Sequence, residues 1–221
     1  NKTKVYFLIM KTKSLTSLFL LTFLFFHISF SMVFADDFQD AMDAANKEKY
    51  REAFRLFRQS AEQGNASAQL NVGYLYDKGL GVPQDHKKAF KWYRMAAEQG
   101  ISEAQYRVGY LDAMGWGVPQ DYKKALKWYR KAAEQGFAKA QYNLGKMIKN
   151  GRGVAQDSKV AAKWYRKAAE QGHAKAQYNL GVRYAKGDGV FKNYIYAYMW
   201  LDVSYCQIWC LGIFIKRRPD H

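Results

Sequence analysis

The decapeptide KWYRMAAEQG at residues 91–100 returns almost unchanged as KWYRKAAEQG at residues 127–136 and again at residues 163–172. Its closing glycine, together with the earlier one of SAEQG, occupies positions 64, 100, 136 and 172, so consecutive copies are 36 residues apart. A fixed period of roughly 20–50 residues is typical of an array of similar supersecondary units. This stretch therefore predicts a repeat architecture.

Each unit divides into two segments with helical periodicity, helix A and helix B, separated by a loop that contains two glycines. Helix A is expected over about residues 66–78 in the first full unit, where it carries SAQLNVGYLY. Helix B opens after an aspartate in the N-cap position and ends at the closing glycine, which adopts the left-handed conformation readily. The N-cap aspartates are Asp85, Asp121 and Asp157.

Small and aromatic side chains recur at fixed places in the units and indicate how the helices pack. Small residues such as Ala68, Gly73 and Ala89 would let helix backbones approach closely. Aromatic rings would then fill the remaining space, and burying one is worth about 1.5–3 kcal/mol in transfer terms. The aromatic column consists of Trp92, Trp128, Trp164, Trp200, Tyr93, Tyr129 and Tyr165. We therefore expect an all-α chain of stacked helical hairpins.

The period also divides the chain. We expect a degenerate capping unit at 36–64, full units at 65–100, 101–136 and 137–172, and a partial fourth unit at 173–205.

The tail at residues 206–221 departs from the repeat pattern. Bulky Tyr205, Cys206 and Ile208 fall where earlier units have alanine, glutamate and glycine. We infer a frameshifted or truncated reading frame after about Tyr205; the alternative is a genuine apolar terminal helix that docks on a partner. Cys206 and Cys210 are the two cysteines of the chain, so no disulfide framework supports the repeats.

The N-terminal region has the order of a targeting segment. Residues 1–9 precede Met10 and are expected to be upstream sequence. Two lysines, an apolar run at 15–34 and small residues follow, which is typical of a secretory signal peptide over residues 10–35. This order predicts a periplasmic or secreted protein. The run is also near the ~20 residues that span a membrane, so an uncleaved anchor is the alternative.

The chain is strongly basic, with 35 basic and 19 acidic residues among 221 and a formal net charge of +16. Such a charge attracts an acidic protein, an anionic lipid or a glycan, whereas a solvated basic face is the plainer alternative. Nucleic acid is not an expected partner of an exported chain. The basic ladder of helix B consists of Lys87, Lys88, Lys91, Arg94, Lys123, Lys124, Lys127, Arg130, Lys131, Lys159, Lys163, Arg166 and Lys167.

The unit AxAQxxxGxxYxxGxGVxxDxxKAxxWYxxAAxxG is present three times and partly a fourth time, across about residues 54–205. It resembles the Sel-one-like repeat (SLR), a relative of the tetratricopeptide repeat (TPR). The resemblance implies a right-handed α-solenoid of stacked antiparallel helix pairs that binds other proteins as a scaffold or adaptor. Bacterial members are often exported, which favours a place in the bacterial cell envelope.

The sequence contains no catalytic or metal-binding pattern. The four histidines are scattered, HExxH and GxSxG are absent, and the paired loop glycines lack a preceding strand and indicate a turn. We therefore expect no enzyme activity, no cofactor and no metal. One alternative is an envelope protein that binds or hydrolyses β-lactams or muropeptides, as reported for cysteine-rich relatives. Another is a secretory-pathway adaptor in a eukaryote, which the sequon at residues 65–67 allows.

The variable positions of helix A define the candidate binding surface. Residues at i, i+4 and i+7 share one side of a helix, and in this family helix A lines the concave groove. The resemblance therefore implies a protein or peptide partner there. Alternatively, the asparagines of this set only bond neighbouring helices. The set, called here the variable stripe, consists of Asn71, Tyr74, Arg107, Tyr110, Asn143, Lys146 and Asn179.

Overall fold

The computed structural model describes residues 38–203, which form ten helices and no strand. A first helix covers 38–46, and a last one begins at 194 and continues to 203, where the described part ends. Between them, helix A and helix B alternate. Helix A corresponds to α3 (Ala66–Lys78), α5 (Ser102–Met114), α7 (Ala138–Lys149) and α9 (Ala174–Lys186). Helix B corresponds to α2 (Tyr50–Glu62), α4 (His86–Glu98), α6 (Tyr122–Glu134) and α8 (Ser158–Glu170).

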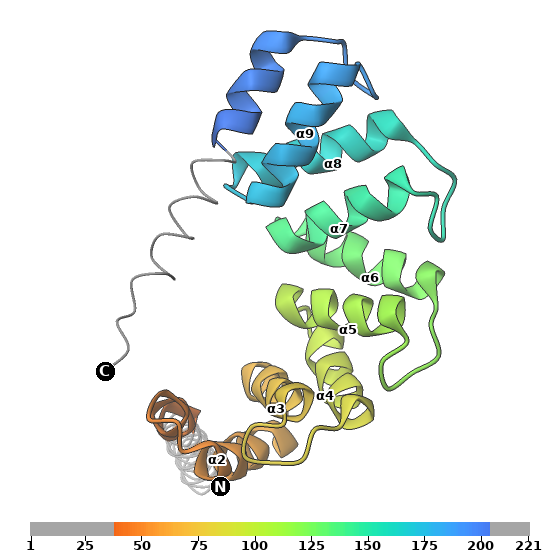
Figure 1. The fold of residues 1–221 in the computed structure, drawn as a ribbon. Helices are drawn as coiled ribbons and strands as arrows, with labels where there is room; N and C mark the ends of the chain where they lie inside the picture. Colours follow the sequence, from red (N-terminus) through yellow and green to blue (C-terminus); the bar gives the residue numbers. More distant parts are fainter. Residues whose placement is uncertain (1–37, 204–221) are drawn as a thin grey trace, which may run out of the picture.

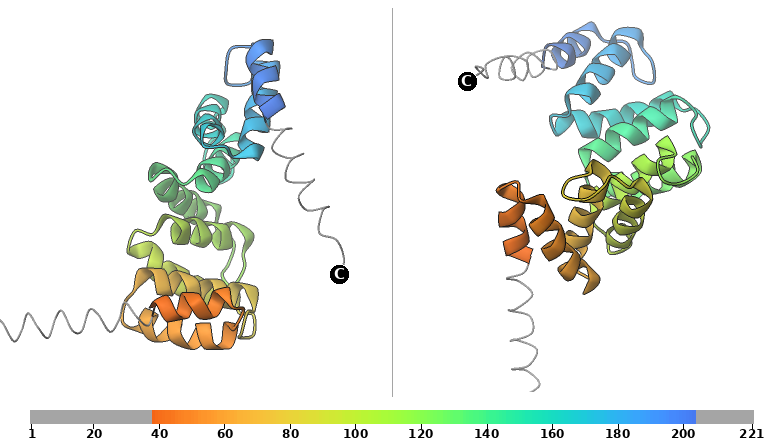
Figure 2. Two further views of the ribbon diagram at one scale, coloured as in Figure 1. Left: turned by 90° about the vertical axis from the view of Figure 1, so that its left-hand side faces the viewer. Right: turned by 60° about the horizontal axis from the view of Figure 1, so that its bottom comes forward.

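Consecutive helices pack against one another from α2 to α9. Figure 1 shows them following one arc, and the side view of Figure 2 shows successive hairpins stacked in layers. The predicted all-α, right-handed solenoid of antiparallel helix pairs is confirmed. No helix among residues 38–203 has the length and apolar character to cross a bilayer. The segments expected at 1–9, 10–35 and 206–221 lie outside the described residues.

The helix boundaries follow from the caps that the sequence predicted. Asp85 accepts a hydrogen bond from the Lys88 N–H at 2.9 Å, and Asp121 and Asp157 cap α6 and α8 in the same way. At the other end, Gly100 has a φ of +96°, where a side chain would be strained. Caps of this kind set the ends of each helix B independently of its neighbours.

Tyrosine, rather than tryptophan, forms the buried aromatic column. Tyr93, Tyr129 and Tyr165 are at most 2% exposed, whereas the tryptophan beside each of them is half-buried. The glycine of helix A explains the close fit, because a Cβ added at Gly73 would lie 2.6 Å from the Tyr93 ring. The expectation that both aromatic residues fill the interior is therefore correct for tyrosine and only partly correct for tryptophan. Lysines cover the outer edge of the indoles, as with Lys131 over Trp128 at 4.5 Å.

A ladder of buried glutamines joins successive units. Gln105 on α5 donates to the carbonyl of Ala97 on α4 at 3.2 Å and accepts from the side chain of Gln135, the C-cap residue of α6, at 2.8 Å. The same pair of bonds is made by Gln69 and by Gln141. Because each glutamine touches the helix B before it and the helix B after it, the ladder fixes the register of the array.

The second glycine of each loop provides another joint between units. A Cβ added at Gly117 would lie 2.4 Å from the backbone carbon of His86, at the start of the preceding helix B. Gly81, Gly153 and Gly189 lie against the equivalent first turns of α2, α6 and α8. Only glycine allows the loop to approach the helix this closely, because any side chain would collide with the backbone.

Candidate functional site

The variable stripe is distributed over four parallel helices rather than gathered in one cavity. Tyr74 and Lys146 are exposed, and the other members are partly buried. Helices α3 and α5 contribute the first four residues of the stripe, α7 the next two, and α9 contributes Asn179. The stripe is therefore a row of side chains along the array, a form that suits an extended partner better than a compact ligand.

Arg107 connects the first two units of the stripe. Its guanidinium lies over the Tyr74 ring, 5.8 Å from the ring centre, and donates to Glu103 Oε1 at 3.0 Å. The Nε of Arg107 is buried and has no hydrogen-bond partner among the described residues. Burial disfavours its charge, but the nearby Tyr93 and Glu103 outweigh this effect, so the pKa of Arg107 is raised. The side chain is thus a fixed cation with one unused donor.

An aromatic cluster lies beside Tyr110 and was not predicted. The Trp116 ring meets Tyr110 edge-on at 5.6 Å and stacks on His86 at 5.1 Å. His86 Nδ1 in turn lies 3.1 Å from the buried Asp77 carboxylate. Trp116 is a loop residue and is 43% exposed. The available signal was a tryptophan in a loop position that other units fill with leucine, arginine or aspartate.

The asparagines of the stripe already have partners within the chain. Asn71 donates to the Ser67 carbonyl at 2.9 Å, and Asn179 donates to the Lys175 carbonyl at 2.7 Å. Asn143 lies with Lys146 in a small hollow of about 40 Å³. Tyr106 lies in the preceding repeat, on α5. Burial raises the pKa of Tyr106, and a side-chain hydrogen bond with Asn143 opposes that rise. The bonds of Asn71 and Asn179 to these carbonyls lie within α3 and α9, whereas the bond of Asn143 to Tyr106 joins α7 to α5.

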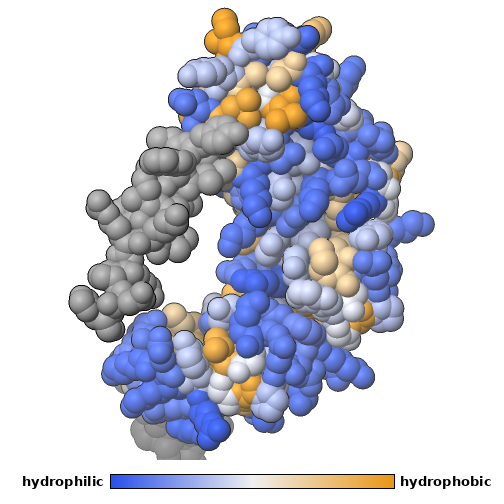
Figure 3. Space-filling model, viewed as in Figure 1, coloured by the Kyte–Doolittle hydropathy of each residue, from blue (hydrophilic) through white to orange (hydrophobic). Residues whose placement is uncertain are grey.

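The face of the array seen in Figure 3 is mainly hydrophilic, with a hydrophobic patch near the C-terminal end of the described part and smaller ones over the earlier units. The large exposed apolar side chains there include Phe191, Tyr194, Ile195 and Tyr198. In residues 38–203, no group of three histidine, cysteine, aspartate or glutamate side chains is placed to hold a metal ion.

These features define a class of protein, a helical repeat scaffold whose variable side chains lie on an invariant frame. The family model of the Sel1 repeat matches residues 46–65, 66–101, 102–137, 138–173 and 174–207. The chain therefore belongs to the Sel1 repeat family, and the resemblance stated from its motifs is confirmed.

Solved structures of bacterial proteins share the fold. A protective antigen of uropathogenic Escherichia coli with an SLR fold is 34% identical over 79% of this chain, with a TM-score of 0.76. This chain spans 38% of the length of that protein. A Sel1 repeat protein from Oxalobacter formigenes is 37% identical over 78% of this chain and 68% of its own, with a TM-score of 0.73. No functionally curated protein matches the chain significantly.

Proposed function

We propose that the protein is an exported scaffold that binds a protein partner along the variable stripe, in the bacterial cell envelope or outside the cell. The observation that carries this proposal is the contrast between frame and stripe. The ladder glutamines of helix A and core alanines such as Ala68 recur in every unit, whereas the stripe presents tyrosine, arginine, lysine and asparagine in different order. Tyrosine and arginine are frequent among residues that dominate protein interfaces.

The stripe also has the chemistry for binding a peptide. Arg107 keeps a buried Nε–H without a partner among the described residues, beside the exposed ring of Tyr74. The Nε–H itself is enclosed, but the Arg107 side chain is partly exposed, so a peptide carbonyl or carboxylate beside Tyr74 would meet its charge, and the ring would cover an apolar side chain. Trp116 adds a second exposed ring, which meets Tyr110 of the stripe edge-on at 5.6 Å.

The partner would be identified by crosslinking the chain in its host, followed by mass spectrometry. The double variant Asn71→Ala/Arg107→Ala should then weaken binding at least tenfold, measured by titration calorimetry. A matched control is Lys91→Ala/Lys127→Ala, which changes two exposed residues of helix B and should bind normally. Circular dichroism would establish that both variants are folded. Unchanged affinity of a folded double variant would exclude the stripe as the binding surface.

Export is tested separately by sequencing the N-terminus of the mature protein. The signal-peptide proposal expects cleavage after Ala35, so Asp36 would be the first residue. An N-terminus at Met10 in a membrane fraction would instead indicate the uncleaved anchor.

A further inference from the structure

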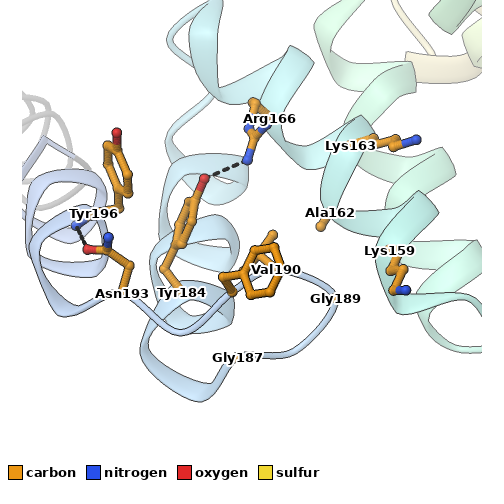
Figure 4. A pocket seen from close by; sticks show the side chains of 11 residues that line it. Lys159, Ala162, Lys163, Arg166, Tyr184, Gly187, Gly189, Val190, Asn193 and Tyr196 are labelled. Carbon is orange, nitrogen blue, oxygen red and sulfur yellow. Dashed lines mark hydrogen bonds between the residues drawn. The ribbon is translucent and has the colours of Figure 1, made fainter.

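A cavity of about 760 Å³ lies near the C-terminal end of the described part, between α8 and the loop that follows α9. We call it the α8 pocket. Its α8 side consists of Lys159, Ala162, Lys163 and Arg166, and its other side of Tyr184, Gly187, Gly189, Val190, Phe191, Asn193 and Tyr196. Figure 4 shows Ala162 facing the loop and Arg166 pointing to Tyr184. This volume is in the range of pockets that bind small ligands or short peptide segments.

The pocket exists because a small residue replaces a large one at a repeated position. Two repeats earlier, the equivalent joint has Phe90 in place of Ala162, and its cavity is only about 350 Å³. One repeat earlier, the position is held by Leu126, which is buried. The frame of the array therefore accepts a large apolar side chain here, and Ala162, which is itself only 3% exposed, leaves this position of the joint less filled than Phe90 or Leu126 does.

The charge of the α8 pocket also differs from that of the earlier joint. There, Asp112 and Asp121 face Arg94 and Lys124. In the α8 pocket the positions of the two aspartates are taken by Tyr184 and Asn193. Asn193 still caps its helix, because its Oδ1 accepts from the Tyr196 N–H at 3.0 Å, but it has no charge.

Three cations consequently line the α8 pocket with no acidic side chain among its described lining residues. Arg166 is held in place by a hydrogen bond to the Tyr184 hydroxyl at 2.5 Å, and its guanidinium lies 5.9 Å from the centre of that ring. Lys159 and Lys163 lie along the α8 edge and are exposed. An anion that entered would therefore meet unneutralised positive charge beside an ordered guanidinium.

The remaining surface of the pocket is apolar and aromatic. Phe191 at its rim is 95% exposed, which is unusual for a phenylalanine, and Tyr196 is also exposed. A partner that covered Phe191 would remove this apolar area from water, and its carboxylates would pair with the three cations. We propose that the α8 pocket binds an acidic peptide segment, with at least one aromatic or aliphatic side chain, of a partner protein.

The test uses the full chain, labelled with ¹⁵N, and the blocked peptide Glu-Asp-Phe-Asp-Glu at up to roughly millimolar concentration. We expect amide shifts confined to residues 159–166 and 184–196. The peptide with glutamine and asparagine in place of its acids should bind at least tenfold more weakly, and so should the peptide with alanine in place of phenylalanine. Shifts elsewhere, none at all, or equal binding of the neutral peptide would overturn the proposal.

The decisive variant is Ala162→Phe, which restores the side chain of the earlier joint. It should weaken peptide binding at least tenfold, because the phenyl ring occupies the cavity. A second variant, Lys159→Glu/Lys163→Glu, changes only exposed residues and should have the same effect, which covers the case in which Ala162→Phe does not fold. The matched control Lys123→Glu/Lys127→Glu, one repeat earlier, should bind normally.

Two results would count against a peptide in particular. If both pocket variants bind the peptide as the unaltered chain does, the pocket is not its site. If vesicles of phosphatidylglycerol bind in a manner that Ala162→Phe abolishes while the peptide does not bind, the pocket recognises a lipid surface, and the peptide proposal is wrong.

Discussion

Replacing Gln105 by alanine removes two hydrogen bonds from the interior of the array at once. The amide of Gln105 no longer reaches the Ala97 carbonyl, and the side chain of Gln135 loses its acceptor. Gln105 is buried, whereas Gln135 is exposed and can rebond to water. The bond lost on the Ala97 side is not replaced by solvent, although the Ala97 carbonyl still accepts from the Gly100 N–H at 3.1 Å.

Two net hydrogen bonds contribute about 1 kcal/mol each, but the Ala97 carbonyl keeps the Gly100 N–H as a donor at 3.1 Å, and Gln135 can bond to water. We expect Gln105→Ala to lower the free energy of unfolding by about 1–2 kcal/mol. For a folded region of this size, that corresponds to a fall in Tm of about 2–8 °C.

Thermal and urea unfolding followed by circular dichroism would measure the change. Gln63→Ala is the matched control, because Gln63 holds the register position of Gln135 but makes no side-chain hydrogen bond among the described residues. It should alter stability by less than about 0.5 kcal/mol. If Gln105→Ala were as mild as Gln63→Ala, the glutamine ladder would not stabilise the array.

Two further predictions follow from buried groups at the joints. Asp112 is 2% exposed, and burial raises its pKa to about 6, so its ionised form is less stable in the folded state than in the unfolded chain. The protein is therefore more stable while Asp112 is protonated, and this stability is lost as the pH rises from about 4 through 6. In urea titrations, the free energy of unfolding of Asp112→Asn should exceed that of the unaltered chain by about 2–3 kcal/mol at pH 7 but not at pH 3. An equal difference at both pH values would contradict this. Gly115→Ala and Gly117→Ala both place a side chain at a positive φ, but only the second collides with the His86 backbone. Gly117→Ala should therefore lower the free energy of unfolding by about 1 kcal/mol more than Gly115→Ala does. Equal losses would show that the loop can move away from α4 at little cost.

The repeat sequence was sufficient to predict the frame. The period, the N-cap aspartates and the closing glycines each depend on local backbone requirements, and local requirements are visible in a sequence. The burial of Tyr93 rather than Trp92 depends on the angle between helices, which the spacing of the two residues does not contain. The helix boundaries could therefore be predicted, but not the choice between adjacent rings.

The contacts between units were harder to predict than those within a unit. Gln105 and Gln135 are separated by 30 residues, and nothing in either helix indicates that their side chains meet. The α8 pocket depends on Ala162, which in the sequence is one more alanine among many. Its effect on the pocket can be seen only in the structure, where Ala162 lines the same cavity as Phe191 and takes the position that Phe90 has two repeats earlier. The variable stripe stays a prediction, with the contacts of Arg107 in its support.

The glutamine ladder also bears on how such a chain changes its length. Each glutamine of the ladder bonds only to the adjoining units. If residues 101–136 were removed, Gln141 would take the place of Gln105 and could donate to the Ala97 carbonyl with the same sequence spacing. The stretches at 127–136 and 163–172 are identical, so removing or adding one whole unit between them leaves the same residues on both sides of the new junction. Evolution can therefore lengthen or shorten the reach of the molecule in steps of 36 residues without inventing a new interior.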